Sequence, residues 1–456
     1  MKFVAEAAGA EIRRGAGETP VKNACTDSRM AQAGDLFFAL KGERFDGHNY
    51  LNEVAAKGVA AVVVEQKKAP AQLPACAVLV VDDARAALGR VAAAYRREFD
   101  LPVVAVGGSN GKTTTKELIA SALRRKLATL WSEASFNNDI GVPLTLLRLE
   151  KSHRAAVLEA GTNHPGELAP LVKMIRPRYG VLTNIGREHL EFFGDLAGVA
   201  QEECWLAELL PADGKLFVNG DDAGMEPVLR RTRATIVRVG LNDGNDWRAK
   251  GIRLDKNGVT FRVEAPKAEF NGEYRINLLG RHQVTNALLA VAVSEELGLG
   301  RPAVRDGLAE CQAPKMRLQF WEAGGVRVLD DAYNANADST LAALETLCGL
   351  PLQGRRVAVL GDMNELGTHS EAAHAEVGRR AAELGIGQLF AVGKMAPVMA
   401  RAARAAGLAR VMEFADVDAA VKAVKDFLKA GDVVLLKASR ASRLERIAAS
   451  LKSLKS

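Results

Sequence analysis

The feature that most constrains this chain is the segment VVAVGGSNGKTTTKE at residues 103–117, where an apolar run leads into a glycine-rich turn and then into a helical pattern that begins near Lys112. Glycines at positions 107, 108 and 111 let several backbone N–H groups converge on one anion, and the helix adds its positive N-terminal end. The segment therefore predicts a phosphate-binding loop between a strand and a helix.

Two side chains give this loop its chemistry. Lys112 supplies a mobile cation for the terminal phosphates, and the hydroxyl of Thr113 can bind a phosphate-bound magnesium ion. The common pattern has a glycine five residues before Gly111, but position 106 is Val, so this loop is one residue short. A glycine-rich turn without a ligand is the alternative, and the loop alone does not separate a kinase, a motor ATPase, a switch GTPase and an ATP-driven ligase.

Length and composition restrict the class of protein. A chain of 456 residues is too long for one ordinary domain. The net charge of +6 is spread along the chain, which suits anionic small molecules and gives no indication of nucleic acid. The five cysteines are widely separated and suit a reducing compartment. We find neither a signal peptide nor a membrane span and expect a cytoplasmic monomer.

The first hundred residues are expected to form a separate α/β domain. Strand patterns at residues 35–40 and 59–65 flank a helix, and an amphipathic helix follows at residues 85–99. Leu101-Pro102 ends that helix, because the residue before a proline is disfavoured in the α conformation. A domain boundary near residue 100 follows.

Strands alternate with helices after this boundary, which predicts a central domain with a parallel sheet covered by helices. The expected strands are residues 103–106, 155–159, 180–184 and 215–219. Residues 235–277 differ, because short alternating strands flank an Asn257-Gly258 turn and predict an antiparallel extension. Helices at residues 283–296 and 302–310 lead to Pro314.

A second βαβ series begins after Pro314 and predicts a doubly wound, Rossmann-like domain. Its expected strands are residues 326–331, 356–360, 389–392, 411–414 and 433–437, each followed by a helical pattern. The predicted fold is therefore α/β with three domains at residues 1–100, 101–314 and 315–456, of which the second is the P-loop domain.

Polar residues recur where predicted strands end, the edge at which open α/β sheets bind ligands. Glu159 ends one strand and suits magnesium as a hard oxygen ligand, and His189 follows the next strand. Asn137 and Asn138 lie on a turn and offer amides to phosphate oxygens. Asn286 lies in the first turns of a helix, where an amide could face a base. The alternatives are a solvated glutamate, a packed histidine, an ordinary turn and a helix cap.

Three strands of the last domain end in further polar groups. These groups predict a polar surface, called the wall below, that faces a nucleotide on one side and a zwitterionic substrate on the other. Arg317, just past Pro314, lies at the expected hinge. The groups at the strand ends are Asp330, Asp331, Asn334 and Asn336, then Asp362 and Glu365, then Lys437, Ser439 and Arg440.

Taken together, these motifs resemble the Mur ligases, the ATP-dependent amide-bond-forming enzymes of bacterial cell-wall synthesis. GSNGKTT, EAGTNHPGE, TNIGREHLE, DDAYNANADS and LGDMNELG occur in that family's order and approximate spacing, over almost the whole chain. DDAYNAN and FNNDIGVPLTLL are similar to the members that add D-alanyl-D-alanine to UDP-N-acetylmuramoyl-tripeptide. The resemblance implies these two substrates, ATP, Mg²⁺, and an N-terminal domain whose Ser28, Arg29 and residues 42–48 hold the uridine diphosphate end.

One position departs from the family. After the His189 segment, Mur ligases usually have a carbamylated lysine that bridges magnesium, whereas the sequence here is VAQEECWLAE and Glu203 takes that place. Glutamate is the nearest unmodified equivalent of a carbamate, although its arm is shorter. We therefore predict that Glu203, or less favourably Glu202, binds the second magnesium ion directly or through water. An exposed helix glutamate is the alternative.

The residues have these expected roles. Catalytic residues are Lys112, His189 and Glu203, and metal ligands are Thr113, Glu159, His189 and Glu203. Nucleotide-binding residues are Gly107, Gly108, Ser109, Asn110, Gly111, Lys112, Thr113, Thr114, Asn286, Arg317 and Asp331. Substrate-binding residues are Ser28, Arg29, Asn137, Asn138, Asn334, Asn336, Asp362, Glu365, Lys437, Ser439 and Arg440.

The implied reaction joins the two substrates through an acyl phosphate, with positive charge offsetting the repulsion between carboxylate and γ-phosphate. Two alternatives remain. One is another Mur or folylpolyglutamate-type amino-acid ligase, and the other is a P-loop regulatory ATPase that binds partners without ligation.

Overall fold

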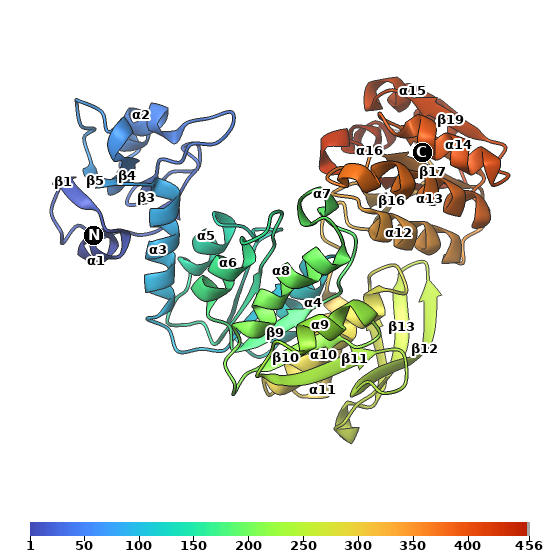
Figure 1. Ribbon diagram of the computed structural model, residues 1–456, viewed down its shortest axis with the longest axis horizontal. Helices are drawn as coiled ribbons and strands as arrows, with labels where there is room; N and C mark the ends of the chain where they lie inside the picture. Colours follow the sequence, from blue (N-terminus) through green and yellow to red (C-terminus); the bar gives the residue numbers. More distant parts are fainter. Residues whose placement is uncertain (454–456) are drawn as a thin grey trace. The chain divides into compact units, whose positions relative to one another are not determined.

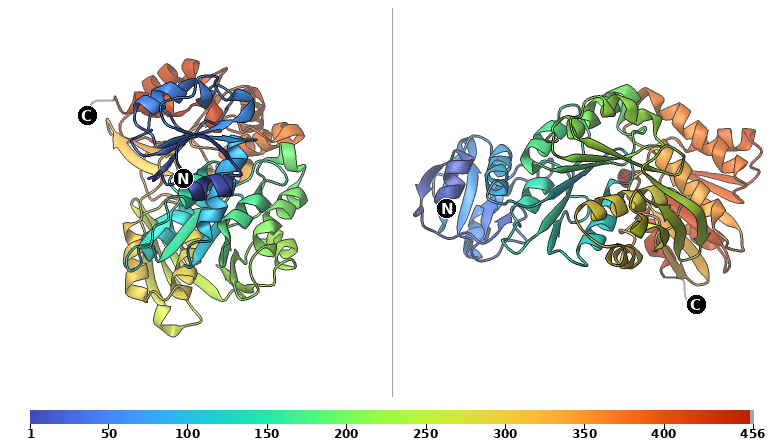
Figure 2. Two further views of the ribbon diagram at one scale, coloured as in Figure 1. Left: turned by 90° about the vertical axis from the view of Figure 1, so that its left-hand side faces the viewer. Right: turned by 90° about the horizontal axis from the view of Figure 1, so that it is seen from below.

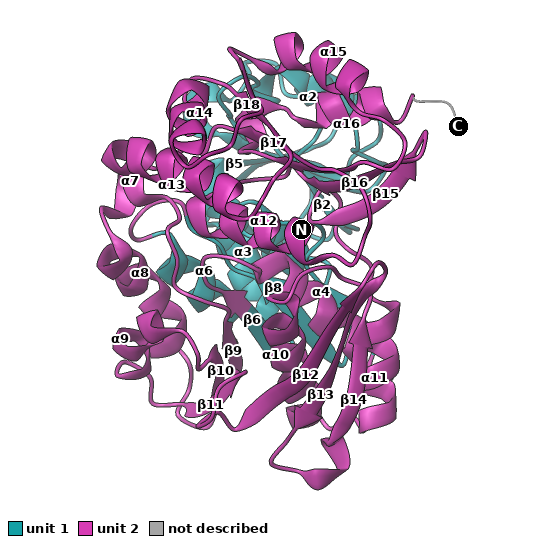
Figure 3. Cartoon of the chain, turned by 90° about the vertical axis from the view of Figure 1, so that its right-hand side faces the viewer, with its two compact units in different colours: residues 1–105, 128–162, 167–178 teal, residues 106–127, 163–166, 179–456 magenta. Residues whose placement is uncertain are grey.

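The computed structural model describes residues 1–453 of the chain. These residues divide into two compact units (Figure 3). Unit 1 comprises residues 1–105, 128–162 and 167–178, and unit 2 comprises residues 106–127, 163–166 and the chain from residue 179 onward. We describe each unit by itself.

The N-terminal part of unit 1 is a five-stranded sheet in the order β1-β5-β4-β3-β2, with only β1 antiparallel to its neighbour. Side chains of β3, β4 and β5 alternate between two apolar clusters, so helices and loops cover both faces of this sheet. Its strands are β1 (Glu11–Arg14), β2 (Ala24–Cys25), β3 (Leu36–Phe38), β4 (Ala61–Glu65) and β5 (Ala77–Val81). Its helices are α1 (Lys2–Ala8), α2 (Leu51–Ala56) and α3 (Ala84–Arg96).

The rest of unit 1 carries two helices and a pair of parallel strands, β7 (Thr129–Trp131) and β8 (Ala155–Glu159). The helices are α5 (Gly141–Leu146) and α6 (Leu168–Ile175). Strand β6 (Val103–Gly107) is fully buried, and the unit boundary falls within it after Ala105. Its last residues therefore begin the loop of unit 2.

The first part of unit 2 has strands in the order β14-β13-β12-β11-β10-β9, parallel from β9 to β12 and antiparallel from β12 to β14. The β12–β13 turn pairs Asp255 with Gly258, as the Asn257-Gly258 signal predicts. The strands are β9 (Tyr179–Leu182), β10 (Lys215–Asn219), β11 (Thr235–Gly240), β12 (Trp247–Asp255), β13 (Gly258–Glu264) and β14 (Gly272–Ile276). The helices are α4 (Lys112–Leu123), α7 (Leu190–Phe193), α8 (Leu196–Glu208), α9 (Glu226–Leu229), α10 (Gln283–Glu296) and α11 (Arg301–Glu310).

The C-terminal part of unit 2 is a sheet in the order β15-β16-β20-β17-β18-β19, in which only β15 runs antiparallel. Helices cover both faces, with α15 and α16 on one face and α12 and α13 on the other (Figures 1 and 2). The strands are β15 (Gln319–Ala323), β16 (Val326–Asp331), β17 (Arg356–Gly361), β18 (Gln388–Val392), β19 (Val411–Phe414) and β20 (Val433–Lys437). The helices are α12 (Ala337–Gly349), α13 (Ser370–Glu383), α14 (Ala396–Ala405), α15 (Val417–Phe427) and α16 (Glu445–Leu451).

The α/β class and the two sheet patterns after residue 100 are confirmed, and the expected domain boundaries stay predictions. Some expected elements are shorter than their apolar runs: the strand expected at residues 35–40 is β3 at Leu36–Phe38, and the helix expected at 85–99 ends at Arg96. β9 ends at Leu182, so residues 183 and 184 belong to the following loop. Among residues 1–453, no helix is long and apolar enough to cross a membrane.

Candidate active site

The loop between β6 and α4 has the backbone geometry that its glycines predict. Gly108 and Gly111 have φ angles of 103° and 86°, in the region that L-residues rarely adopt. A methyl group on Gly108 would lie 2.5 Å from Thr183 Oγ1 and 2.8 Å from Thr183 N, and one on Gly111 would lie 2.9 Å from Asn286 Oδ1. Both positions therefore need glycine for conformation and for space.

The segment at residues 183–189, between β9 and α7, holds this loop in place. Ser109 N donates to Asn184 O at 2.8 Å, Asn110 N donates to Asn184 Oδ1 at 3.0 Å, and Gly186 N donates to Ser109 Oγ at 2.8 Å. Ser109 and Asn110 are thus fixed by hydrogen bonds before α4 begins.

Lys112 forms a buried ion pair with Glu188, a residue that the sequence did not single out. The Lys112 Nζ–Glu188 Oε2 distance is 3.2 Å, and Nζ also donates to Gly108 O at 2.5 Å and to Ser109 O at 3.2 Å. Burial raises the pKa of Glu188, and the nearby Lys112 opposes that rise. The ammonium therefore lies folded back on its own loop.

Glu203, on α8, also faces the loop. Its side chain is 0 % exposed, and Oε2 accepts the N–H of Gly108 at 2.8 Å, whereas Oε1 has no hydrogen-bond partner among the described residues. Burial raises the pKa of Glu203 to about 8, against the lowering effect of Lys112. The neighbouring Glu202 instead accepts the N–H of Gly166 at 2.8 Å. Of the two candidate glutamates, Glu203 contacts the phosphate-binding loop.

Thr113, Thr114 and Asn286 are buried beside Lys112. Thr113 Oγ1 is a second buried oxygen without a hydrogen-bond partner in the described part of the chain. Asn286 lies on α10 against Gly111, and its amide donates to Gln283 Oε1 at 2.8 Å. The roles expected for these residues stay predictions.

Glu159, Asn137 and Asn138 belong to unit 1, where the end of β8 brings the first two together. Asn137 Nδ2 donates to Glu159 Oε1 at 2.9 Å, and Glu159 Oε2 is buried without a partner within residues 1–453. Asn138 Oδ1 accepts the N–H of Gly141 at 2.9 Å at the start of α5. Asn137 therefore orients a carboxylate that keeps one oxygen uncommitted.

Ser28, Arg29 and residues 42–48 lie in connecting segments of the N-terminal part of unit 1, outside the strands of its sheet. Arg29 is exposed and pairs with Asp27 at 2.6 Å, while Ser28 O accepts from Lys57 Nζ at 2.7 Å. In the other segment, His48 Nδ1 donates to Asp46 Oδ1 at 2.6 Å. These contacts order both segments, and their expected role with the uridine diphosphate end stays a prediction.

Several polar residues at the strand ends of the C-terminal sheet bind to one another. Lys437 is buried, pairs with Asp331 at 2.7 Å and donates to Asn334 O at 2.9 Å. Arg317 stacks over the Tyr333 ring at 4.2 Å. The structure thus uses Lys437 to hold the β16–α12 loop, on which Asn334 is exposed.

The other residues of this expected wall fix neighbouring loops. Asp362 accepts the N–H groups of Lys394 and Met395 at 2.9 Å each. Ser439 Oγ accepts the N–H of Asn364 at 2.8 Å and donates to Ala335 O at 3.2 Å. Arg440 is exposed and pairs with Glu445 at 3.2 Å.

Within unit 2, the C-terminal sheet contacts the phosphate-binding loop and the 183–189 segment. Asn336 Nδ2 donates to Asn110 Oδ1 at 2.9 Å, and His189 Nδ1 lies 2.5 Å from Glu365 Oε2. His189 has a φ of 48°, and the hydrogen bond from its ring lowers the pKa of Glu365. Two predicted residues of the last domain therefore reach two predicted residues of the central domain.

Arg187 adds a contact that sequence reasoning missed. Its guanidinium binds Asp338 at 2.6 Å and Glu376 at 2.6 Å, residues of α12 and α13. The partners lie 151 and 189 positions away, so no local pattern could have indicated them. These ion pairs join the 183–189 segment to α12 and α13.

The donor atoms suit magnesium. The described residues contain no group of three or more His, Cys, Asp or Glu side chains that could hold a metal ion. Magnesium, however, is usually bound through one or two carboxylates together with substrate phosphates. Within unit 2, the buried oxygens Thr113 Oγ1 and Glu203 Oε1 have no partners among the described residues, and both are hard ligands.

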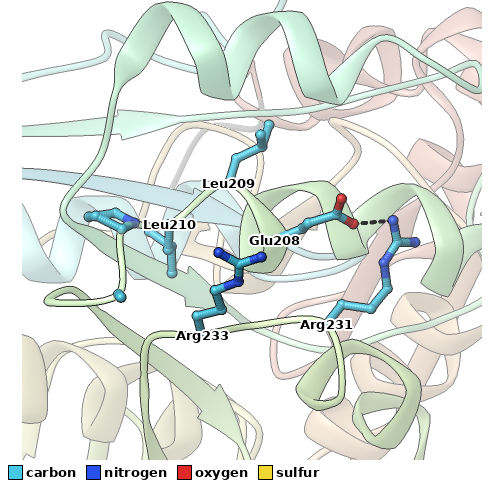
Figure 4. Close-up of a pocket in the computed structure, with 7 residues that line it drawn as sticks. Glu208, Leu209, Leu210, Arg231 and Arg233 are labelled. Carbon is cyan, nitrogen blue, oxygen red and sulfur yellow. Dashed lines mark hydrogen bonds and ion pairs between the residues drawn. The ribbon is translucent and has the colours of Figure 1, made fainter.

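A surface hollow of about 560 Å³ lies elsewhere in unit 2, at the C-terminal end of α8 (Figure 4). Glu208 and Arg231 form an ion pair at its edge, and Arg233 also lines it. None of the expected site residues lines this hollow, so we assign it no role in the reaction.

Three family models match successive parts of the chain. They describe the Mur ligase family catalytic domain at residues 20–96, the Mur ligase middle domain at residues 106–294 and the Mur ligase glutamate ligase domain at residues 316–440. The chain belongs to the Mur ligase family. It therefore has the three-domain α/β architecture of these enzymes, and the resemblance expected from its motifs is confirmed.

Two curated relatives of this Mur ligase carry the same name. UDP-N-acetylmuramoyl-tripeptide–D-alanyl-D-alanine ligase of Escherichia coli is 37% identical over 433 residues, covering 93% of this chain and 92% of the relative. The enzyme of that name from Bacillus subtilis is 34% identical and covers 94% of this chain and 93% of its own. The likeness thus extends over nearly the full length of both proteins.

Solved structures agree with the sequence relatives. MurF from Acinetobacter baumannii superposes with a TM-score of 0.90 at 32% identity, covering 99% of this chain and 98% of that chain. MurF ligase from Thermotoga maritima in complex with ADP gives a TM-score of 0.82 at 26% identity, covering 95% and 98%. Both structures match nearly the full length of this chain.

Proposed function

We propose that this chain is the ATP-dependent ligase that joins D-alanyl-D-alanine to UDP-N-acetylmuramoyl-tripeptide in peptidoglycan precursor synthesis. The observation that carries the proposal is the 37% identity to the Escherichia coli enzyme of that activity over 93% of this chain. The loop supports it, because its glycines, Lys112 and Thr113 form the site that an ATP-dependent ligase requires.

The proposed reaction proceeds through an acyl phosphate. The tripeptide carboxylate attacks the γ-phosphorus of ATP and ADP leaves, and the amine of D-alanyl-D-alanine then attacks the acyl carbon and displaces phosphate. Both partners of the first step are anions, so the cation of Lys112 and the amides at the start of α4 lower the repulsion between them. Contacts from Asn336 and Glu365 to the loop region support exclusion of water from the acyl phosphate.

We infer that Thr113, Glu159, His189 and Glu203 would hold magnesium, which would supply charge neutralisation for the phosphates. For Glu203 the support is its uncommitted buried Oε1 and its place where Mur ligases have a carbamylated lysine. Glu203 brings a carboxylate to the loop without any modification. The same proposal includes the other nucleotide- and substrate-binding roles that the sequence predicts. It also includes three domains at residues 1–100, 101–314 and 315–456, and the ranges of the three family models support these boundaries.

A phosphate-release assay tests the function. We expect ATP- and Mg²⁺-dependent release only when UDP-N-acetylmuramoyl-tripeptide and D-alanyl-D-alanine are both present, and none from Lys112→Ala. Release with a single amino acid or glutamate instead of the dipeptide would identify another ligase of the family. Release from ATP without either substrate would favour a regulatory ATPase. We further propose that the protein is a monomer located in the cytoplasm. The five free thiols support this location, because free cysteines are typical of a reducing compartment.

A further inference from the structure

The Lys112–Glu188 pair is the strongest unassigned feature of the molecule. The side chains of Lys112 and Glu188 are only 13% and 8% exposed. An ammonium has three N–H groups, and Gly108 O, Ser109 O and Glu188 Oε2 are three acceptors within 3.2 Å of Nζ. One of these acceptors is ionisable and comes from outside the loop, so Glu188 contributes the one acceptor among the three that can form an ion pair with the ammonium.

Glu188 is held at this place by its own segment. Its N–H donates to Gly186 O at 2.9 Å, and Gly186 N donates to Ser109 Oγ at 2.8 Å. Asn184, two residues earlier, binds Ser109 and Asn110 through its backbone and its side chain. The carboxylate therefore approaches the ammonium from a backbone that is already fixed on the loop.

Arg187 ties the same backbone to α12 and α13. Its backbone N–H donates to Asp338 Oδ2 at 2.8 Å, and its guanidinium binds both Asp338 and Glu376. Because Arg187 and Glu188 are consecutive, a movement of Glu188 away from Lys112 would disturb the Arg187 ion pairs. The Lys112–Glu188 contact is thus built into the fold.

We propose that Glu188 is a positioning residue for Lys112. The Glu188 carboxylate holds the Lys112 ammonium on the loop, and it weakens the binding of nucleoside di- and triphosphates because it competes with their terminal phosphates. The inference rests on the proposed nucleotide site and adds to it a residue that sets its affinity. A phosphate must displace the carboxylate from Lys112, and a buried charge-assisted bond is costly to exchange.

The test is ADP binding to the full chain by titration calorimetry, without peptide substrates. We expect Glu188→Gln to bind ADP about tenfold more tightly, which corresponds to about 1.4 kcal/mol. The KM for ATP should fall without a matching rise in kcat. The matched control is Glu226→Gln, which removes a carboxylate from an exposed ion pair on α9 and should leave ADP binding unchanged.

A double-mutant cycle separates positioning from simple charge repulsion. In a Lys112→Met background, Glu188→Gln should no longer change ADP affinity, because there is no ammonium to release. An equal tightening in that background would show that Glu188 only repels phosphate, and would overturn the inference.

A second variant guards against loss of folding. Glu188→Asp keeps the charge and withdraws the carboxylate by one methylene, so it should tighten ADP binding by a smaller factor. Unchanged or weaker ADP binding in both Glu188 variants would overturn the inference and leave the nucleotide site standing. Absence of ADP binding to the unmodified chain would instead overturn the nucleotide site together with the inference.

Discussion

Replacement of Gly108 by alanine should destabilise the protein by about 3 kcal/mol and abolish ADP binding. A φ of 103° costs an L-residue about 1–2 kcal/mol. The new methyl group would also lie 2.8 Å from Thr183 N and 2.9 Å from Asn184 O, which are backbone atoms that cannot rotate away. The shift that relieves these contacts would weaken the Thr183 N–Gly107 O and Ser109 N–Asn184 O hydrogen bonds, each worth about 1 kcal/mol.

A matched control isolates the contribution of the close contacts. Gly244 has a φ of 94°, and a methyl group there would meet no atom within 4 Å. Gly244→Ala should therefore lose only the conformational part, about 1–2 kcal/mol, and should bind ADP normally. Urea unfolding and ADP calorimetry on both variants provide the comparison. Equal losses of stability in the two variants would refute the role assigned to the contact between Gly108 and the 183–184 backbone.

Three further outcomes are expected. Removal of CO2 should leave phosphate release by the unmodified chain unchanged, because Glu203 needs no carbamylation. Glu203→Gln should reduce that release at least tenfold, which is about 1.4 kcal/mol in activation free energy, and Glu202→Gln should reduce it less. Full activity of Glu203→Gln would contradict the metal role. Arg187→Gln should speed hydrogen exchange of residues 183–189, because its ion pairs with Asp338 and Glu376 are lost, and unchanged exchange would count against that restraint. Burial lowers the pKa of His374 from 6.5, so the fold favours the neutral imidazole and the protein should lose stability as pH falls below 6.5. Between pH 7 and 5, the Tm of His374→Gln should therefore fall less than the Tm of the unmodified chain. Equal falls of the two Tm values would argue against this linkage.

The phosphate-binding loop and the strand ends could be predicted from sequence because their signals are local. The glycines, Lys112 and Thr113 all lie within residues 107–113, and apolar runs mark β8, β10 and β16 with the bounds expected. Strand β1, by contrast, reads Glu-Ile-Arg-Arg and is exposed at all four positions, so no apolar alternation marks this antiparallel edge.

The parts of the site that sequence reasoning missed depend on contacts between distant segments. Glu188 in a loop next to His189 looks like a solvated carboxylate, and it is buried only because the segment docks on residues 108–110. Lys437 is another such case: the structure pairs it with Asp331, a partner 106 positions away, and its expected substrate role stays a prediction. A buried charged side chain needs a partner of opposite charge, but the sequence alone does not show which residue the tertiary structure brings next to it.

The 183–189 segment also constrains how the gene for this chain could vary. Arg187, Glu188 and His189 are consecutive, yet they bind α12 and α13, the phosphate-binding loop and Glu365 respectively. A single codon inserted or deleted between Asn184 and Arg187 would put all three side chains out of register at once. A substitution in this segment disturbs one contact, which one further substitution can restore, whereas a change in length disturbs all three contacts. The length of the segment should therefore be the most strictly inherited property of this part of the chain.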